Sequence, residues 1–119
     1  MLSSVPAYAE WMPVNTSDEE STLYVDLDTI RRKGDLVKMW ELLDYKTAQS
    51  VEGVSHLSVK AQLEFDCAEE RSRLLAFLQY SGNMGRGKVV LTSSNEAKWA
   101  PVPPDTIGLR LWTVACSKK

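Results

Sequence analysis

His56 is the single histidine of this 119-residue chain, and acid–base catalysis near neutral pH would draw first on its imidazole. No nucleophile motif such as G-x-S-x-G frames it. A zinc site needs several Cys and His ligands at short spacing, and the chain has only two cysteines besides this histidine. His56 falls in a polar stretch, so we interpret it as a solvated surface residue.

A glycine-rich segment, which carries Gly82, Gly85 and Gly87, is the next candidate for chemistry. Phosphate-binding loops of this kind need a helix directly after the glycines, because the first N–H groups of that helix face the phosphate. Here the β-prone residues 88–91 follow. The segment therefore predicts a turn between strands, and we expect no cofactor.

Two pairs of carboxylates stand at i, i+2 spacing, Asp26 with Asp28 and Glu64 with Asp66. Acid–base hydrolysis needs two carboxyl groups that face one substrate. Strand alternation places these four side chains on the wet faces of their strands, so we expect them to be solvated. A hydrolase is the least favoured hypothesis, and the sequence predicts a protein that is not an enzyme.

The basic residues are concentrated in the second half of the chain. The formal net charge is −2, but residues 1–70 carry 6 basic and 14 acidic side chains, whereas residues 71–119 carry 8 basic and 2 acidic ones. This balance excludes a generally basic nucleic-acid binder. Two interpretations stay open: pairing with acidic residues across strands, or a cationic patch for a polyanion, lipid head groups or an acidic partner. The residues concerned are Arg71, Arg73, Arg86 and Lys88, with Lys98 and Arg110.

The elements that must position these residues are predicted mainly as antiparallel strands. Residues 57–67 alternate strictly between apolar and polar, and residues 22–28 alternate in the same way ahead of a turn at Gly34. Further strands are predicted over residues 36–45 and 88–93, with a short first strand over 11–15. Residues 46–56 are predicted as a loop. Residues 71–81 fit a strand or a helix, and the short connections around them favour a strand.

A helix is favoured for the segment that follows Pro103 and Pro104, with Asp105 or Thr106 as its N-cap. Leu109, Trp112 and Cys116 then form one apolar stripe, although Ile107, Leu109 and Leu111 also alternate like a strand. We therefore predict the α+β class, a five- or six-stranded antiparallel β-sheet meander with a C-terminal α-helix packed on one face.

The cysteines and the N-terminus bear on the compartment. An even cysteine count in an exported chain favours a disulfide, here between Cys67 and Cys116, which would tie the helix to the sheet; two buried thiols in a cytosolic protein are the alternative. Residues 1–9 resemble the end of a signal peptide, with Ala7 and Ala9 in an A-x-A pattern; a polar terminus is the alternative. We expect one domain over residues 10–119, periplasmic or secreted, without a transmembrane segment.

Short motifs occur in order along the chain at residues 24–26, 30–34, 37–40, 58–60, 64–67, 80–81, 84–85, 99, 102–106 and 114–116. With these motifs and its two cysteines, the chain resembles the surface-adhesin protein E-like family of exported bacterial proteins. The resemblance implies a six-stranded antiparallel sheet, a helix tied to it by a Cys67–Cys116 disulfide, and a possible homodimer. It also implies adhesion, although the lipid-attachment cysteine of the family's namesake has no counterpart here, and no binding residue can be carried over.

These observations together predict an exported binding module without catalytic activity. It would present a sheet face or an open edge strand to a host or envelope protein. The alternative is a periplasmic carrier of a small ligand, haem or lipid, on the concave face of the sheet. In that case Trp40, Trp99 and Trp112 would line the pocket, unless they belong to the core.

Overall fold

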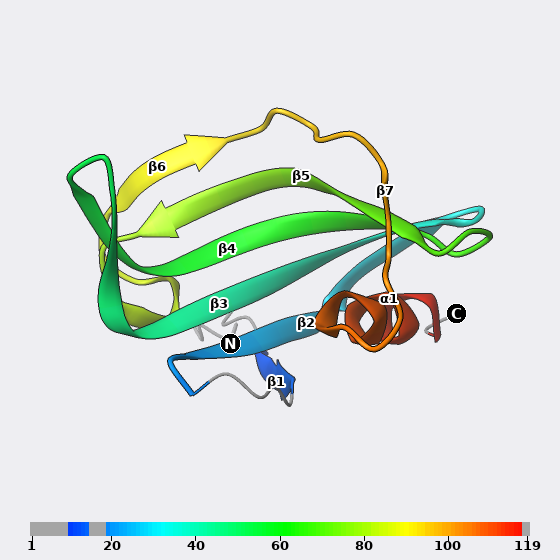
Figure 1. The fold of residues 1–119 in the computed structure, drawn as a ribbon, viewed down its shortest axis with the longest axis horizontal. Helices are drawn as coiled ribbons and strands as arrows, with labels where there is room; N and C mark the ends of the chain where they lie inside the picture. The colour runs from blue at the N-terminus through cyan, green and yellow to red at the C-terminus, as the bar shows by residue number, and fades with distance from the viewer. Residues whose placement is uncertain (1–9, 15–18, 118–119) are drawn as a thin grey trace, which may run out of the picture.

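The structure, a computed structural model that describes residues 10–14 and 19–117, is one open antiparallel sheet with one helix against it (Figure 1). The predicted meander and C-terminal helix are confirmed, and the predicted signal-peptide remnant, residues 1–9, lies outside the described residues. The elements in chain order are β1 (Met12–Val14), β2 (Ser21–Lys33), β3 (Leu36–Val51), β4 (Val54–Asp66), β5 (Arg71–Tyr80), the 3-10 turn η1 (Asn83–Gly85), β6 (Val89–Ser93), β7 (Ala100–Pro101) and α1 (Ile107–Ser117).

The sheet follows the order of the chain from β1 to β6, with every neighbouring pair antiparallel. The two-residue strand β7 pairs with the start of β5, on the same side of β5 as β6. The predicted turn at Gly34 joins β2 to β3, and the residue has a φ of 63°, which glycine adopts at little cost. Residues 71–80 form the favoured strand and not the alternative helix.

The loop predicted over residues 46–56 is wrong. Strands β3 and β4 continue through this region and meet in a two-residue turn at Glu52 and Gly53, closed by the pair Val51 and Val54. Both turn residues have positive φ, 51° and 81°, as a tight hairpin with right-handed strand twist requires. A shift in register between Asp44 and Gln49 shows where β3 has more residues than β4 between two paired positions, as in a β-bulge.

Helix α1 begins where the sequence predicts, after a proline stop. The Thr106 hydroxyl accepts a hydrogen bond from the Leu109 N–H at 3.2 Å and donates one to the Pro103 carbonyl at 2.7 Å, so Thr106 is the N-cap. Leu111 and Ala115 are the buried residues of the helix. They pack on one face of the sheet, which we call the α1 face, against the core residues Leu23, Val25, Val37, Met39 and Phe65.

The predicted disulfide between Cys67 and Cys116 is confirmed. The two Cα atoms lie 5.6 Å apart, so the bond ties the last turns of α1 to the residue after β4. Arg32 donates a hydrogen bond to the Cys116 carbonyl at 3.0 Å, and the Trp112 indole N–H donates one to the Asp66 carbonyl at 2.8 Å. These contacts fix the helix along one end of the α1 face and leave the other end uncovered by it (Figure 1).

Candidate functional site

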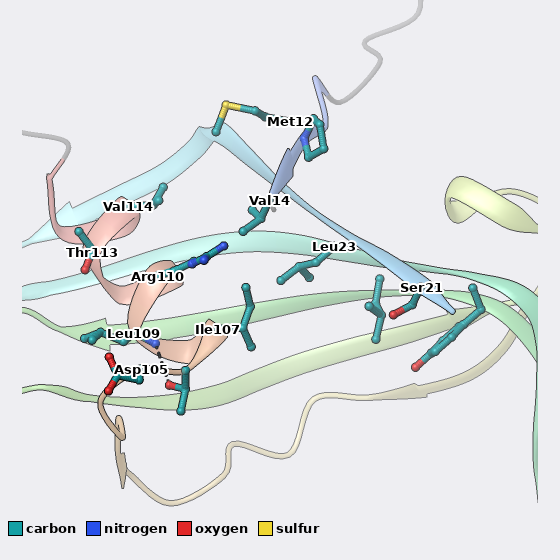
Figure 2. Close-up of a pocket in the computed structure, with 14 residues that line it drawn as sticks. Met12, Val14, Ser21, Leu23, Asp105, Ile107, Leu109, Arg110, Thr113 and Val114 are labelled. Atoms are coloured by element: carbon teal, nitrogen blue, oxygen red, sulfur yellow. Dashed lines mark hydrogen bonds between the residues drawn. The ribbon is translucent and has the colours of Figure 1, made fainter. Parts of the chain in front are cut away.

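An open groove with a volume of about 1170 Å³ lies between the first turns of α1 and the edge formed by β1 and β2 (Figure 2). Ile107 from the helix and Leu23 from β2 approach each other across it, and Arg110 extends from α1 toward β1. Most lining side chains are apolar, with polar groups interspersed. The lining residues are Met12, Pro13, Val14, Ser21, Leu23, Leu43, Tyr45, Asp105, Thr106, Ile107, Leu109, Arg110, Thr113 and Val114.

The floor of the α1 face carries one acidic side chain among apolar ones. Strand alternation puts Met39, Glu41 and Leu43 on the same face, and Leu43 lines the groove. In the cross-strand register, Glu41 lies opposite Val25 of β2 and Ala61 of β4, which are both buried. Glu41 is therefore enclosed on four sides by apolar residues.

The Glu41 carboxyl is partly buried and, within residues 10–14 and 19–117, has no hydrogen-bond or ion-pair partner. Burial disfavours its charged form and raises its pKa from 4.5 to about 7. Glu41 was not among the predicted site residues, because residues 36–45 were predicted only as a strand, with no face assigned to each side chain. The overlooked signal was one acidic residue inside the run Met39–Leu43.

The opposite face of the sheet carries a network of arginines, carboxylates and Trp99. Arg71 Nε lies 2.9 Å from Asp66 Oδ2, and Arg73 Nη2 lies 2.7 Å from Glu64 Oε1. Both guanidinium groups stack on the Trp99 ring, with distances from the guanidinium carbon to the ring centre of 4.8 and 4.6 Å. Trp99 belongs to residues 94–101, which we call the strap and which connects β6 through β7 toward the helix.

The expectation that Glu64 and Asp66 are solvated is wrong, since their exposed fractions are 5% and 6%. Arg71 and Arg73 of β5 and Trp99 of the strap cover these two carboxylates. The alternation of apolar and polar residues along one strand does not predict that cover. Burial opposes ionisation of Asp66, but hydrogen bonds from Arg71 and from the N–H groups of Ala68 and Glu69 outweigh it and lower the pKa of the carboxyl. For Arg71 and Arg73, the network matches the first of the two interpretations of the basic residues, pairing with acidic residues across strands.

The four residues of the predicted basic patch do not form one cluster. Arg71 and Arg73 lie at the start of β5 and pair with carboxylates. Arg86 and Lys88 follow the other end of β5 and are exposed. Binding of a polyanion by these residues stays a prediction.

The sequence profile of the surface-adhesin protein E family matches residues 11–117. The chain belongs to this family. The fold is similar to that of solved protein E structures from Haemophilus influenzae. The selenomethionine form has a TM-score of 0.66 at 14% identity and covers 90% of this chain and 93% of that one. Crystal form II has a TM-score of 0.64 at 16% identity, with 80% of each chain covered. No curated protein sequence matches the chain.

Within this protein E family member, His56 is buried, so its interpretation as a solvated residue is wrong. Its exposed fraction is 4%, because the extended β3–β4 hairpin pairs it with Gln49 inside the sheet. Its ring meets that of Tyr45 edge-on, with the centroids 5.7 Å apart. In the part of the chain that the structure describes, His56 Nδ1 has no hydrogen-bond partner, and no group of three or more His, Cys, Asp or Glu could hold a metal ion.

The glycine-rich segment of the family member is the predicted turn. The N–H of Met84 donates to Asp44 Oδ1 at 2.8 Å, and the N–H of Gly85 donates to Ser58 Oγ at 2.9 Å. The backbone donors that a phosphate would require are therefore engaged within the protein.

The remaining carboxylate pair is split by a bulge in β2. Asp28 is exposed as expected, but Asp26 is buried, so its predicted solvation is wrong. The Asp26 carboxylate accepts the Asp28 N–H at 3.0 Å, where the register between β2 and β3 shifts. It thus has a structural role in the bulge. Among the described residues, no helix is long and apolar enough to cross a membrane.

Proposed function

We propose that this surface-adhesin protein E family member is an exported binding module without catalytic activity, which engages a host or envelope protein through the open edge of β6. The observation that carries the proposal is the exposure of this edge. Strand β6 ends the sheet, and its outer side pairs with no strand of residues 10–14 and 19–117. Val89 and Leu91 on it are 48% and 45% exposed.

An open edge strand offers a row of backbone N–H and C=O groups to an incoming strand, and side chains at alternate positions add specificity. The exposed residues Arg86 and Lys88 precede β6, and the strand itself has no acidic residue. We therefore propose an extended partner segment that carries apolar and acidic side chains. A homodimer stays a prediction, which sedimentation velocity would test.

The test is display of the chain on a non-adherent bacterium, followed by counting of the bacteria that attach to cultured epithelial cells. We expect several-fold more attachment than with the empty display vector, and loss of that gain in the double variant V89K/L91K. The matched control is V51K/V54K, since these valines are 47% and 45% exposed but close a hairpin and do not lie on the open edge. Equal attachment by both double variants would refute the use of β6.

A second candidate function is a periplasmic carrier of a small apolar ligand, haem or lipid, which the groove beside α1 favours. The expected tryptophan lining is wrong. Trp99 contacts Arg71 and Arg73, and the Trp112 indole N–H donates to the Asp66 carbonyl. No tryptophan is among the groove residues that the structure describes. Equilibrium dialysis against haem and against a phospholipid tests the carrier. The variant I107D, in which a carboxylate replaces an exposed apolar group of the groove, is expected to lose the ligand.

A further inference from the structure

We propose that the α1 face binds an amphiphilic cation, a primary ammonium group on an aliphatic chain, with Glu41 as its ion-pairing residue and the adjoining groove as the seat of the chain. This inference deepens the carrier hypothesis by naming its ligand class. It does not depend on adhesion through β6.

The first support is the isolation of the Glu41 carboxyl. Its nearest positions on the sheet are Val25, Met39, Leu43 and Ala61, and none of these can donate a side-chain hydrogen bond. A carboxylate taken partly out of water without a partner is costly, and a cation that reaches it recovers much of that cost. The pKa of Glu41 is raised to about 7 because burial removes water from the carboxylate and no cation among the described residues replaces it.

The second support is the continuity between Glu41 and the groove. Leu43 lies two residues further along the same face of β3 and lines the groove. Aliphatic side chains from β1, β2 and α1 complete the wall, which suits a flexible hydrocarbon chain. The charged or titratable groups along the groove are Asp105 and Arg110 from the helix side and Tyr45 from β3.

The third support is the sign of the charge on the floor. A fatty acid would bring a second carboxylate toward Glu41, and like charges in a partly buried site repel each other. An alkylammonium ion brings the opposite charge to the same place. A cation without an apolar chain would leave the aliphatic walls of the groove unfilled.

The test is isothermal titration calorimetry at pH 8 with dodecylammonium chloride, kept below its critical micelle concentration, and with laurate and ethylammonium as comparison ligands. We expect dodecylammonium to bind at least tenfold more tightly than either. E41Q is expected to weaken its binding at least tenfold. E52Q, which alters an exposed glutamate of the β3–β4 turn, is the matched control and is expected to bind as the wild type does.

The pH dependence gives a second readout. Because protonation of Glu41 competes with the cation, a pKa of about 7 predicts binding about 30-fold weaker at pH 5.5 than at pH 8, and a flat profile in E41Q. Equal affinity for laurate and dodecylammonium, unchanged in E41Q, would refute the inference and leave a carrier of apolar chains in place. No binding of any alkyl probe would refute the inference and the carrier together, while attachment through β6 would be unaffected.

Discussion

Arg73 stacks on Trp99, with its guanidinium carbon 4.6 Å from the centre of the ring, while the same guanidinium holds Glu64 at 2.7 Å. Arg71 stacks on the ring as well, so the indole lies in contact with two cations that belong to neighbouring positions of one strand face. Trp99 therefore adds side-chain contacts to the backbone pairing that holds the strap on β5, and it helps to shield two carboxylates from water.

The variant W99A is expected to lower the free energy of unfolding by about 2 kcal/mol, because it removes both stacking contacts and exposes the ion pairs below. Urea unfolding followed by circular dichroism measures this change. W99F is the control, since a smaller ring retains part of the cation–π attraction. Equal losses in W99F and W99A would contradict the cation–π role of the ring.

Loss of the disulfide is expected to destabilise the fold strongly. The bond joins residues 49 positions apart, and closure of a loop of this length restricts the unfolded chain by about 4 kcal/mol. The double variant C67S/C116S should show this decrease in urea unfolding. Reduced wild-type protein should unfold at the same urea concentration as the variant. An unchanged midpoint after reduction would mean that α1 is held by packing alone.

Glu41 is expected to make stability depend on pH. Its pKa is about 7 in the folded protein and near 4.5 in the unfolded chain, so the folded protein binds more protons between these values. The free energy of unfolding therefore falls as the pH rises from 4.5 through 7. E41Q should remove this fall and be more stable than the wild type at pH 8, by on the order of 2 kcal/mol after allowance for partial exposure. Thermal unfolding at pH 4, 6 and 8 measures it, with E52Q as the control; parallel profiles of E41Q and wild type would contradict it.

Glycine at position 108 is expected to be replaceable. A Cβ there would meet Thr106 Oγ1 at 3.5 Å and Val102 Cγ1 at 3.8 Å, which are ordinary contacts, so G108A should stabilise the helix by about 0.5 to 1 kcal/mol. G87A is the matched opposite case, because Gly87 has a φ of 83° and its Cβ would collide with Ser81 Oγ. Thermal unfolding distinguishes the two, and destabilisation by G108A would contradict the helix geometry.

Periodicity predicted the parts of this fold that bury one face against the helix, such as the alternating strand from Leu57 and the stripe that ends at Cys116. It failed where strands run past the core. Residues 46–56 are polar, and they form strands because the hairpin continues by backbone pairing with little apolar burial. The prediction of an exposed His56 failed for the same reason, because the extended hairpin buries its side chain.

The candidate site was less predictable than the fold. Glu64 and Asp66 look solvated by alternation, but Trp99, more than 30 positions away, folds back over the arginines that pair with them. Glu41 could not be recognised from the sequence for a different reason. Its apolar neighbours, Val25 on β2 and Ala61 on β4, lie beside it only because of the way the three strands are paired. Such contacts depend on tertiary geometry that a single sequence does not display.

Because Cys116 lies near the C-terminal end of the fold, the disulfide can form only late in folding. Each strand from β2 to β6 pairs with the strand that precedes it in the chain, so the sheet can grow from its N-terminal end. Cys116 lies 49 residues after Cys67, so in an exported chain it reaches the oxidising compartment later than Cys67 does. Until then the Cys67 thiolate can attack a disulfide of another molecule and form a mixed disulfide, with the other sulfur of that disulfide leaving as a thiolate. The covalent bond thus cannot guide the pairing of the first strands, because it can form only after α1 has joined the sheet-forming part of the chain.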